Sequence, residues 1–207
     1  MATTSWAYRR GARPPKMRAF SGFSQKFLWK TFPFAAEYNL TTVIHKFSAE
    51  QWVPFSLPEV FRFFADPRNL PRIMPAWMDI KLERLDVVPP PGLTAVFAGI
   101  GSELEASYRA IPFLPLRVRS VAIITDFRLN QYFEDVQGKG PFQSWHHRHE
   151  FAEETRNGIV GTIVRDRIAY DAGFGAVGSW GQRFTIAPQL QRTFDHRQRV
   201  LPGLLGG

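Results

Sequence analysis

Hydrophobic and polar residues alternate along much of the chain, most regularly over residues 102–111. There the apolar-side positions Leu104, Ala106, Tyr108 and Ala110 alternate with the polar positions Glu103, Glu105, Ser107 and Arg109. A period of two is typical of a β-strand with one buried and one exposed face. Similar patterns, bounded by proline, glycine and asparagine, predict strands at residues 42–53, 78–88, 116–127, 129–137, 142–155 and 159–170.

Two short helices are predicted between the first two of these strands. Ser56 followed by Glu59 resembles a capping box at a helix start. The apolar run that follows should stop at Asp66, because the residue before a proline disfavours the helical conformation. Residues 69–74 indicate a second short helix, which Pro75 closes.

The C-terminal part of the chain has a different period. Apolar residues recur there at spacings of three and four, at Val177, Trp180, Phe184, Ala187, Leu190, Phe194 and Leu201. This spacing predicts a long amphipathic helix. Pro188 lies inside it and lacks the N–H that an interior helical turn requires, so we expect Pro188 to kink the helix or to divide it in two.

The order of these elements predicts a single α+β domain over residues 43–202. The order is a strand, two short helices, five or six antiparallel strands and one long helix. These elements bury their apolar faces if the sheet curves around the last helix. Such a layout readily leaves a hollow between the sheet and the helix. The 19 Phe and six Trp residues, within an apolar content of 44%, could line this hollow or form an ordinary aromatic core.

Residues 1–42 show no regular period, and we expect a basic, disordered extension ahead of the domain. They hold seven Lys or Arg residues and one Glu, whereas residues 43–207 hold 19 cations and 17 anions. A tail that mixes basic and aromatic residues could contact a membrane surface weakly. Because the domain itself is nearly neutral and shows no basic stripe, we expect no nucleic-acid partner.

The composition excludes several kinds of site. The chain contains no cysteine, which excludes disulfides, thiolate metal sites and cysteine nucleophiles. No stretch reaches 18 apolar residues, and no apolar signal-peptide core precedes a cleavage site. We therefore expect a cytoplasmic protein without a transmembrane segment.

Four segments carry a resemblance to a known superfamily. They are FRFFADPRNLPRIMPAWM (61–78), FEDVQGKGPFQSWHHRHEF (133–151), GTIVRDRIAYDAGFGAVG (161–178) and RTFDHR (192–197). Between about residues 43 and 201 the chain resembles the SRPBCC superfamily of START-like lipid-transfer domains, pollen-allergen-like ligand carriers and polyketide cyclase/dehydrase-like proteins, and above all an uncharacterised bacterial branch of it. The resemblance implies the helix-grip, START-like fold and an internal cavity for a hydrophobic small molecule.

Two positions depart from the pattern of that superfamily. Val118 stands where a tryptophan is expected, and the segment Asp171-Ala172-Gly173-Phe174 lacks the usual proline before Phe-Gly. Both changes bear on the shape of the cavity, and therefore on the ligand, rather than on the fold.

Alternation also predicts which polar side chains face the hollow. The aromatic and aliphatic residues of three strands mark their inward faces, and these faces also carry Asp135, Gln137, His147, His149 and Asp166. Buried polar groups of this kind form a hydrogen-bonded network between strands, orient one end of a ligand, or take part in acid–base chemistry. His147 and His149 with Asp166 could also ligate zinc, but strand alternation alone places two such histidines on one face.

We expect the ligand to contact a mixed set of residues from the strands and the last helix. They are Tyr108, Val118, Phe133, Asp135, Gln137, Trp145, His147, His149, Asp166, Trp180 and Phe184. Trp77 is expected either in packing or at the cavity mouth. Arg192, Arg197 and Arg199 suit the C-terminal end of a helix and solvent.

Three functions are compatible with these patterns. The first is binding or transport of a lipid-like or polyketide-like hydrophobic molecule. The second is a cofactor-free cyclase or dehydratase in which His147 or His149 acts as general acid or base. The third is a non-enzymatic interaction domain associated with a membrane surface through the basic tail. We expect neither a cofactor nor a bound metal, and the oligomeric state stays open.

Overall fold

The computed structural model describes residues 43–94, 96–112, 114–173 and 183–207. The predicted basic tail at residues 1–42 lies outside the described residues, as do Val177 and Trp180 of the expected C-terminal helix.

Seven antiparallel strands form one sheet, as the alternating pattern predicts. Their order across the sheet is β1-β7-β6-β5-β4-β3-β2, so the first strand pairs with the last. The strands are β1 (His45–Val53), β2 (Lys81–Asp86), β3 (Glu103–Arg109), β4 (Arg117–Arg128), β5 (Tyr132–Lys139), β6 (Ser144–Arg156) and β7 (Ile159–Asp171).

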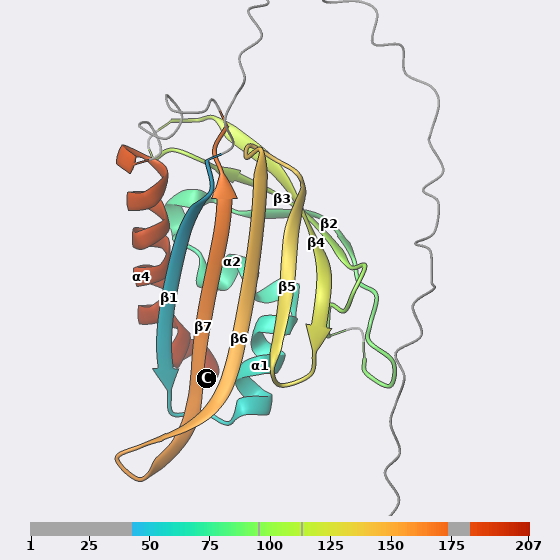
Figure 1. The fold of residues 1–207 in the computed structure, drawn as a ribbon, viewed down its shortest axis with the longest axis vertical. Coiled ribbons are helices and arrows are strands. Elements are labelled where there is room, and N and C mark those ends of the chain that lie inside the picture. The colour runs from blue at the N-terminus through green and yellow to red at the C-terminus, as the bar shows by residue number, and fades with distance from the viewer. Residues whose placement is uncertain (1–42, 95, 113, 174–182) are drawn as a thin grey trace, which may run out of the picture. The chain divides into compact units, whose positions relative to one another are not determined.

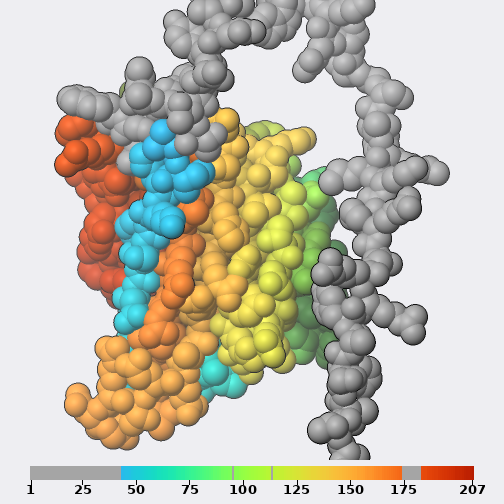
Figure 2. Space-filling model, in the orientation of Figure 1, coloured from blue at the N-terminus to red at the C-terminus, as the bar shows by residue number. Residues whose placement is uncertain are grey.

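The sheet is curved, and the helices lie on one side of it (Figure 1). They are α1 (Leu57–Ala65), η1 (Pro67–Asn69), α2 (Leu70–Ile73), η2 (Ala76–Met78) and α4 (Ile186–Leu205). Figure 2 shows the other side, where β1, β7, β6, β5 and β4 lie next to one another at the surface. The predicted helix-grip arrangement, a curved antiparallel sheet closed by a C-terminal helix, is confirmed.

Helix α1 supplies the centre of the main core. Its residues Val60 and Phe61 are fully buried, and the Phe61 ring contacts Phe127, Phe133 and Phe151 at centroid distances of 5.4, 6.1 and 5.1 Å. Edge-to-face contacts of this kind add to the free energy gained by burying apolar area. This cluster fixes α1 against the middle of the sheet.

The ends of the short helices differ in part from the prediction. Ser56 stands at the N-cap of α1, but its side chain makes no cap hydrogen bond to the backbone; its hydroxyl lies 3.5 Å from the Glu59 carboxylate instead. The predicted capping box is therefore wrong. Asp66 ends α1 in an extended conformation, as expected before Pro67, and its carboxylate accepts a hydrogen bond from the Arg68 N–H.

At two places a tight turn delays the start of a strand relative to its hydrophobic pattern. Met78 belongs to η2, and Asp79 adopts a left-handed conformation with φ of 45°; β2 starts only at Lys81. Leu129, the first residue of the strand predicted at 129–137, lies in a turn and is 43% exposed, because Asn130 turns the chain with φ of 57°. Local turn conformations override the alternation at both places.

The C-terminal helix is interrupted near Pro188, as predicted. Arg183 and Phe184 are helical, Thr185 forms a turn, and α4 begins at Ile186. Pro188 cannot donate a hydrogen bond to the carbonyl of Phe184, whereas Gln189 donates to that of Thr185. Within the described ranges, no helix is long and apolar enough to span a membrane.

Candidate functional site

A cavity of about 550 Å³ lies between the sheet and the helices. One wall comes from the inward faces of β3 to β7, a second from the segment between α1 and η2, and a third from α4. The volume falls within the range of roughly 300–1,000 Å³ that is usual for small-molecule sites. The hollow that the order of the elements predicts is therefore present.

Most of the cavity wall is apolar. Aliphatic and aromatic groups from all three walls face it, among them Ile73, Met74, Trp77, Leu104, Ile124 and Leu190. Small residues of the sheet, Ala106 and Ala122, leave the space in front of them open. A wall of this kind favours an apolar molecule, because burying its surface removes it from water.

The structure places seven of the eleven predicted contact residues in the cavity wall. They are Tyr108, Phe133, Asp135, Gln137, Trp145, His147 and His149. Their strands alternate without slipping over this region, so the inward face that the sequence marks is the face that lines the cavity.

Three of the other predicted contact residues lie outside the cavity wall. Phe184 is 65% exposed, because α4 begins two residues after it and the predicted apolar stripe does not extend back to it. Val118 pairs with Tyr108 across β3 and β4 but is absent from the wall. Asp166 lies behind the wall, and Trp180 is outside the described residues.

Asp166 forms a buried ion pair with Arg197. Arg197 Nη2 donates to both carboxylate oxygens, at 2.9 Å to Oδ2 and 3.1 Å to Oδ1, and both side chains are at most 6% exposed. The guanidinium also lies over the rings of Phe64 and Phe194, at 4.4 and 5.1 Å. The prediction that Arg197 faces solvent at the helix end is wrong, because this residue ties α4 to β7.

Both cavity histidines contact the same oxygen of Asp166. His147 Nε2 donates a hydrogen bond to Asp166 Oδ1 at 3.0 Å. His149 Nδ1 lies 2.7 Å from that oxygen, although its direction is not that of a hydrogen bond. The two rings lie against each other at a centroid distance of 3.8 Å, tilted by 42°. Asp166 therefore orients the His147 ring by a hydrogen bond and lies in close contact with the His149 ring.

These contacts shift the pKa values of the cluster. Burial lowers the pKa of His147, and the neighbouring His149 lowers it further, so His147 is neutral at pH 7. Burial acts on His149 in the same direction, but the charge of Asp166 and the contacts with Asp135 and Asp166 outweigh it and raise its pKa. Burial opposes ionisation of Asp166, yet the charge of Arg197 holds the pKa of this carboxyl well below its usual range.

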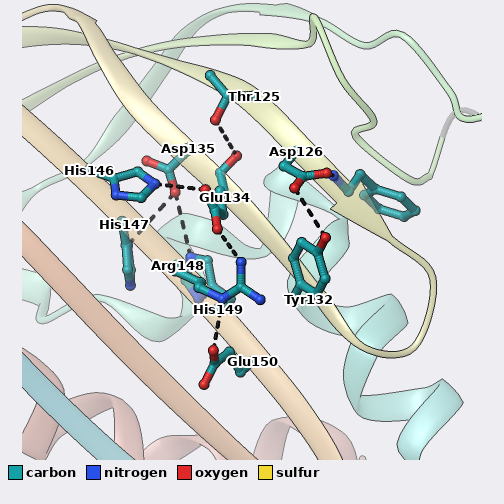
Figure 3. Close-up of polar contacts among 11 residues, drawn as sticks. Thr125, Asp126, Tyr132, Glu134, Asp135, His146, His147, Arg148, His149 and Glu150 are labelled. Atoms are coloured by element: carbon teal, nitrogen blue, oxygen red, sulfur yellow. Dashed lines mark hydrogen bonds and ion pairs between the residues drawn. The ribbon is translucent and has the colours of Figure 1, made fainter. Parts of the chain in front are cut away.

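Asp135 approaches the opposite edges of the two rings (Figure 3). Its Oδ2 atom lies 3.8 Å from His147 Nδ1 and 3.7 Å from His149 Nε2. These distances are too long for hydrogen bonds. The carboxylate and two ring nitrogens thus face one another across a small gap at the cavity wall.

Two more polar groups line the cavity, with different surroundings. The Gln137 amide already donates to the Phe142 carbonyl at 2.7 Å and accepts from the Phe142 N–H at 3.3 Å, so it holds the turn between β5 and β6. Tyr108 is half-buried, and burial raises the pKa of its phenol. Its hydroxyl therefore stays protonated at neutral pH and can donate a hydrogen bond.

The outward residues of β5 and β6 form a separate polar network (Figure 3). Glu134 accepts from His146 at 2.8 Å and pairs with Arg148, which also donates to Glu150 at 2.8 Å. This network lies on the face of the strands opposite to the cavity. Of the run from His146 to Glu150, only His147 and His149 therefore belong to the cavity site, because successive strand residues point to opposite faces.

Several wall residues were not singled out as ligand contacts from the sequence. Met74, Met78 and Thr193 line the cavity, and so does Trp77, for which packing and a cavity position were both considered. The first two lie next to tight turns rather than in periodic segments. The sequence signal for Arg197 is its position three residues after Phe194, which places a cation on the apolar face of the predicted helix.

Comparisons with known proteins show likeness at the level of fold. No family model matches the chain, and no curated protein matches it. A solved protein of unknown function from Staphylococcus aureus aligns with 82% of this chain and 100% of its own, with a TM-score of 0.58 and 13% identity. A protein of Thermus thermophilus aligns with 78% of this chain and 97% of its own, with a TM-score of 0.54 and 16% identity.

A truncated norcoclaurine synthase from Thalictrum flavum is also similar. It aligns with 77% of this chain and 94% of its own, with a TM-score of 0.51 and 13% identity. At such low identity these matches speak for architecture and not for activity.

Proposed function

The chain has the helix-grip fold, which is typical of the SRPBCC superfamily, and a cavity inside it. We propose on these grounds that this protein binds a hydrophobic small molecule between the sheet and α4. The observation that carries the proposal is a cavity of about 550 Å³ with a mostly apolar wall and one corner where ionisable side chains gather. That corner holds Asp135, His147 and His149.

The two parts of the wall have different roles in binding. The apolar part supplies affinity, at roughly 25 cal/mol for each Å² of apolar surface removed from water. The polar corner orients the ligand, because a ligand oxygen or N–H can pair there with groups that already face the cavity. The phenol of Tyr108 offers a further donor. A molecule with a long apolar body and one polar end fits this division.

A fluorescent apolar probe tests the proposal. N-phenyl-1-naphthylamine fluoresces strongly once removed from water, and we expect one site with a Kd on the order of 10 μM, from typical binding energies per heavy atom. Ala122 faces the cavity, so Ala122→Phe fills part of the space. This variant should weaken probe binding more than about tenfold, a loss of roughly 1.4 kcal/mol.

Val121→Phe is the matched control, because Val121 precedes Ala122 in β4 and is absent from the cavity wall. It should leave the Kd within about twofold of the wild type, which is less than about 0.5 kcal/mol. Thermal unfolding of both variants checks that they are folded. Equal probe affinity in all three proteins would contradict a site inside the cavity.

A second candidate function, proton transfer at the cavity wall, is favoured by the state of His147. The Nε2–H group of this ring is held by Asp166 at 3.0 Å, so the lone pair lies on Nδ1, which faces Asp135. Burial lowers the pKa of His147, which keeps the ring neutral and able to accept a proton. A cyclase or dehydratase of polyketide-like substrates requires a general base of this kind.

Dibenzoylmethane, a 1,3-diketone with an acidic methylene group, tests proton transfer. The wild type should accelerate exchange of the methylene protons for deuterium in D₂O, observed by NMR. His147→Gln should slow this exchange by about 100-fold or more, the usual contribution of a general base, while the fluorescent probe still binds. Exchange at the same rate in both proteins would remove the enzymatic candidate and leave the binding function intact.

A further inference from the structure

Asp135, His147 and His149 bring three potential metal ligands together at the polar corner of the cavity. Their ligand atoms all lie within 4.8 Å of one another, and no other such group of three occurs in the described part of the chain. The arrangement follows from strand register, because Asp135 of β5 stands opposite His147 of β6, and His149 follows two residues later on the same face. The three side chains therefore converge without any special loop.

The far nitrogens of both rings lie close to Asp166. His147 Nε2 is 3.0 Å and His149 Nδ1 is 2.7 Å from Asp166 Oδ1. Metal-binding histidines are commonly oriented in this manner, by a carboxylate that contacts the nitrogen not bound to the metal. One buried carboxylate serves both rings here, and Arg197 balances its charge.

The ligand atoms of the three residues that face one another are only slightly further apart than a bound ion requires. Asp135 Oδ2 is 3.8 Å from His147 Nδ1 and 3.7 Å from His149 Nε2. With bonds of roughly 2.0–2.1 Å, a tetrahedral ion holds its ligand atoms about 3.3 Å apart. The two gaps need to close by about half an ångström, which small side-chain rotations supply.

Of the two carboxylates, only Asp166 has a compensating cation among the described residues. Asp166 is already neutralised by Arg197, with contacts to both of its oxygens. Asp135 has ion-pair contacts only with the two histidines among the described residues. These contacts favour Asp135 as the carboxylate ligand over Asp166, the carboxylate considered for a zinc site from the sequence.

We propose that Asp135, His147 and His149 bind one divalent transition-metal ion, best suited to zinc, with one coordination position open toward the cavity. Two imidazoles and one carboxylate are a ligand set that zinc takes in catalytic sites with an open position. All three side chains line the cavity. The ion therefore faces the space that an apolar ligand would occupy.

The charge balance indicates what the open position takes. A divalent ion with one carboxylate and two neutral imidazoles carries a net charge of +1, and the Asp166–Arg197 pair adds none. A ligand carboxylate neutralises this charge and offers an oxygen donor. This step rests on the proposed function, and it specifies the ligand as an apolar chain that ends in a carboxylate.

Isothermal titration of the metal-free full chain with Zn²⁺ tests the site without any organic ligand. The wild type should bind one ion per chain. Asp135→Asn, which keeps the shape of the side chain, should weaken zinc binding by more than about 100-fold, because loss of an outer partner alone costs about 10–100-fold. Asp166→Asn should weaken it by about 10–100-fold for that reason.

His146→Ala is the matched control, because this neighbouring histidine pairs with Glu134 on the opposite face of the sheet. It should leave zinc affinity unchanged. Circular dichroism shows whether each variant is folded, and Asp135→Asn is chosen because it keeps the shape of the side chain. The proposed site is overturned if the wild type does not bind zinc. It is also overturned if Asp135→Asn keeps the wild-type zinc affinity while His146→Ala loses it.

Decanoate and the neutral probe N-phenyl-1-naphthylamine separate the metal from the cavity. Zinc should strengthen decanoate binding at least tenfold in the wild type and should not do so in Asp135→Asn. Binding of the neutral probe should be independent of zinc. If zinc binds but decanoate affinity does not change, the open position is overturned; if the probe binds and zinc does not, the metal site fails while the proposed function stands.

Discussion

Arg197 of α4 and Asp166 of β7 form a buried ion pair, with Arg197 Nη2 2.9 Å from Asp166 Oδ2. The pair joins the helix that closes the cavity to the strand behind the polar corner. Because Asp166 also contacts His147 and His149, the position of α4 and the orientation of the two histidines depend on the same carboxylate. This pair therefore couples the closure of the cavity to the geometry of its polar corner.

Removing one member of this pair should destabilise the fold strongly. Arg197→Met keeps the apolar stem but leaves Asp166 without its cation, so the free energy of unfolding should fall by about 3 kcal/mol. In the double variant Arg197→Met/Asp166→Asn, the free energy of unfolding should fall by less than the sum of the two single decreases, with a difference of at least about 1 kcal/mol. Urea unfolding of all four proteins measures this.

Arg199→Met serves as the control for that cycle. Arg199 lies on the same helix two residues further on and is exposed, so its loss should change the free energy of unfolding by less than about 0.5 kcal/mol. Strictly additive losses in the double variant would show that Arg197 and Asp166 are not coupled.

Two glycine-to-alanine substitutions should have opposite effects on stability. A Cβ at Gly161 would meet the Val53 carbonyl and lie 2.6 Å from the Trp52 ring, so Gly161→Ala should cost about 1–3 kcal/mol. A Cβ at Gly203, in the last turns of α4, meets nothing within 4 Å. Gly203→Ala should stabilise the protein by up to about 1 kcal/mol.

Thermal unfolding of both variants under one set of conditions checks their signs. A melting temperature that rises for Gly161→Ala or falls for Gly203→Ala is the opposite of what the close packing of β1 on β7 and the open surface of α4 imply.

Tryptophan fluorescence should report on ligand binding. Trp77 and Trp145 line the cavity, whereas Trp52 donates its indole N–H to the Glu154 carbonyl at 2.8 Å and lies outside the wall. Binding of N-phenyl-1-naphthylamine should quench tryptophan emission by energy transfer. Replacing Trp77 and Trp145 by Phe should reduce this quenching more than Trp52→Phe does, and the reverse order would contradict a cavity site.

Much of the architecture could be predicted from the sequence because the strands around the polar corner alternate regularly. In β6 the buried His149 and Phe151 share the inward face with His147, as the alternation predicts, and β5 contributes Asp135 in register with them. Register carries face assignment from one strand to the next, so the polar corner could be predicted without coordinates.

Features that depend on contacts distant in sequence could not be predicted in this way. Arg197 is 31 residues from Asp166 in the chain, and an arginine near a helix end ordinarily faces solvent. The choice of Asp135 over Asp166 at the gap between the histidines depends on this ion pair. The start of α4 at Ile186, which leaves Phe184 exposed, depends on how Pro188 interrupts the helix, and periodicity alone does not locate that break.

Crystals of the protein exposed to xenon gas test the central claim most directly, because xenon enters dry apolar voids in protein interiors. We expect electron density from xenon, or from a co-purified organic molecule, in the space bounded by Leu104, Ile124 and Leu190. A crystal structure in which α4 packs directly against the sheet, with neither xenon nor a ligand between them, would contradict the presence of a ligand-binding cavity.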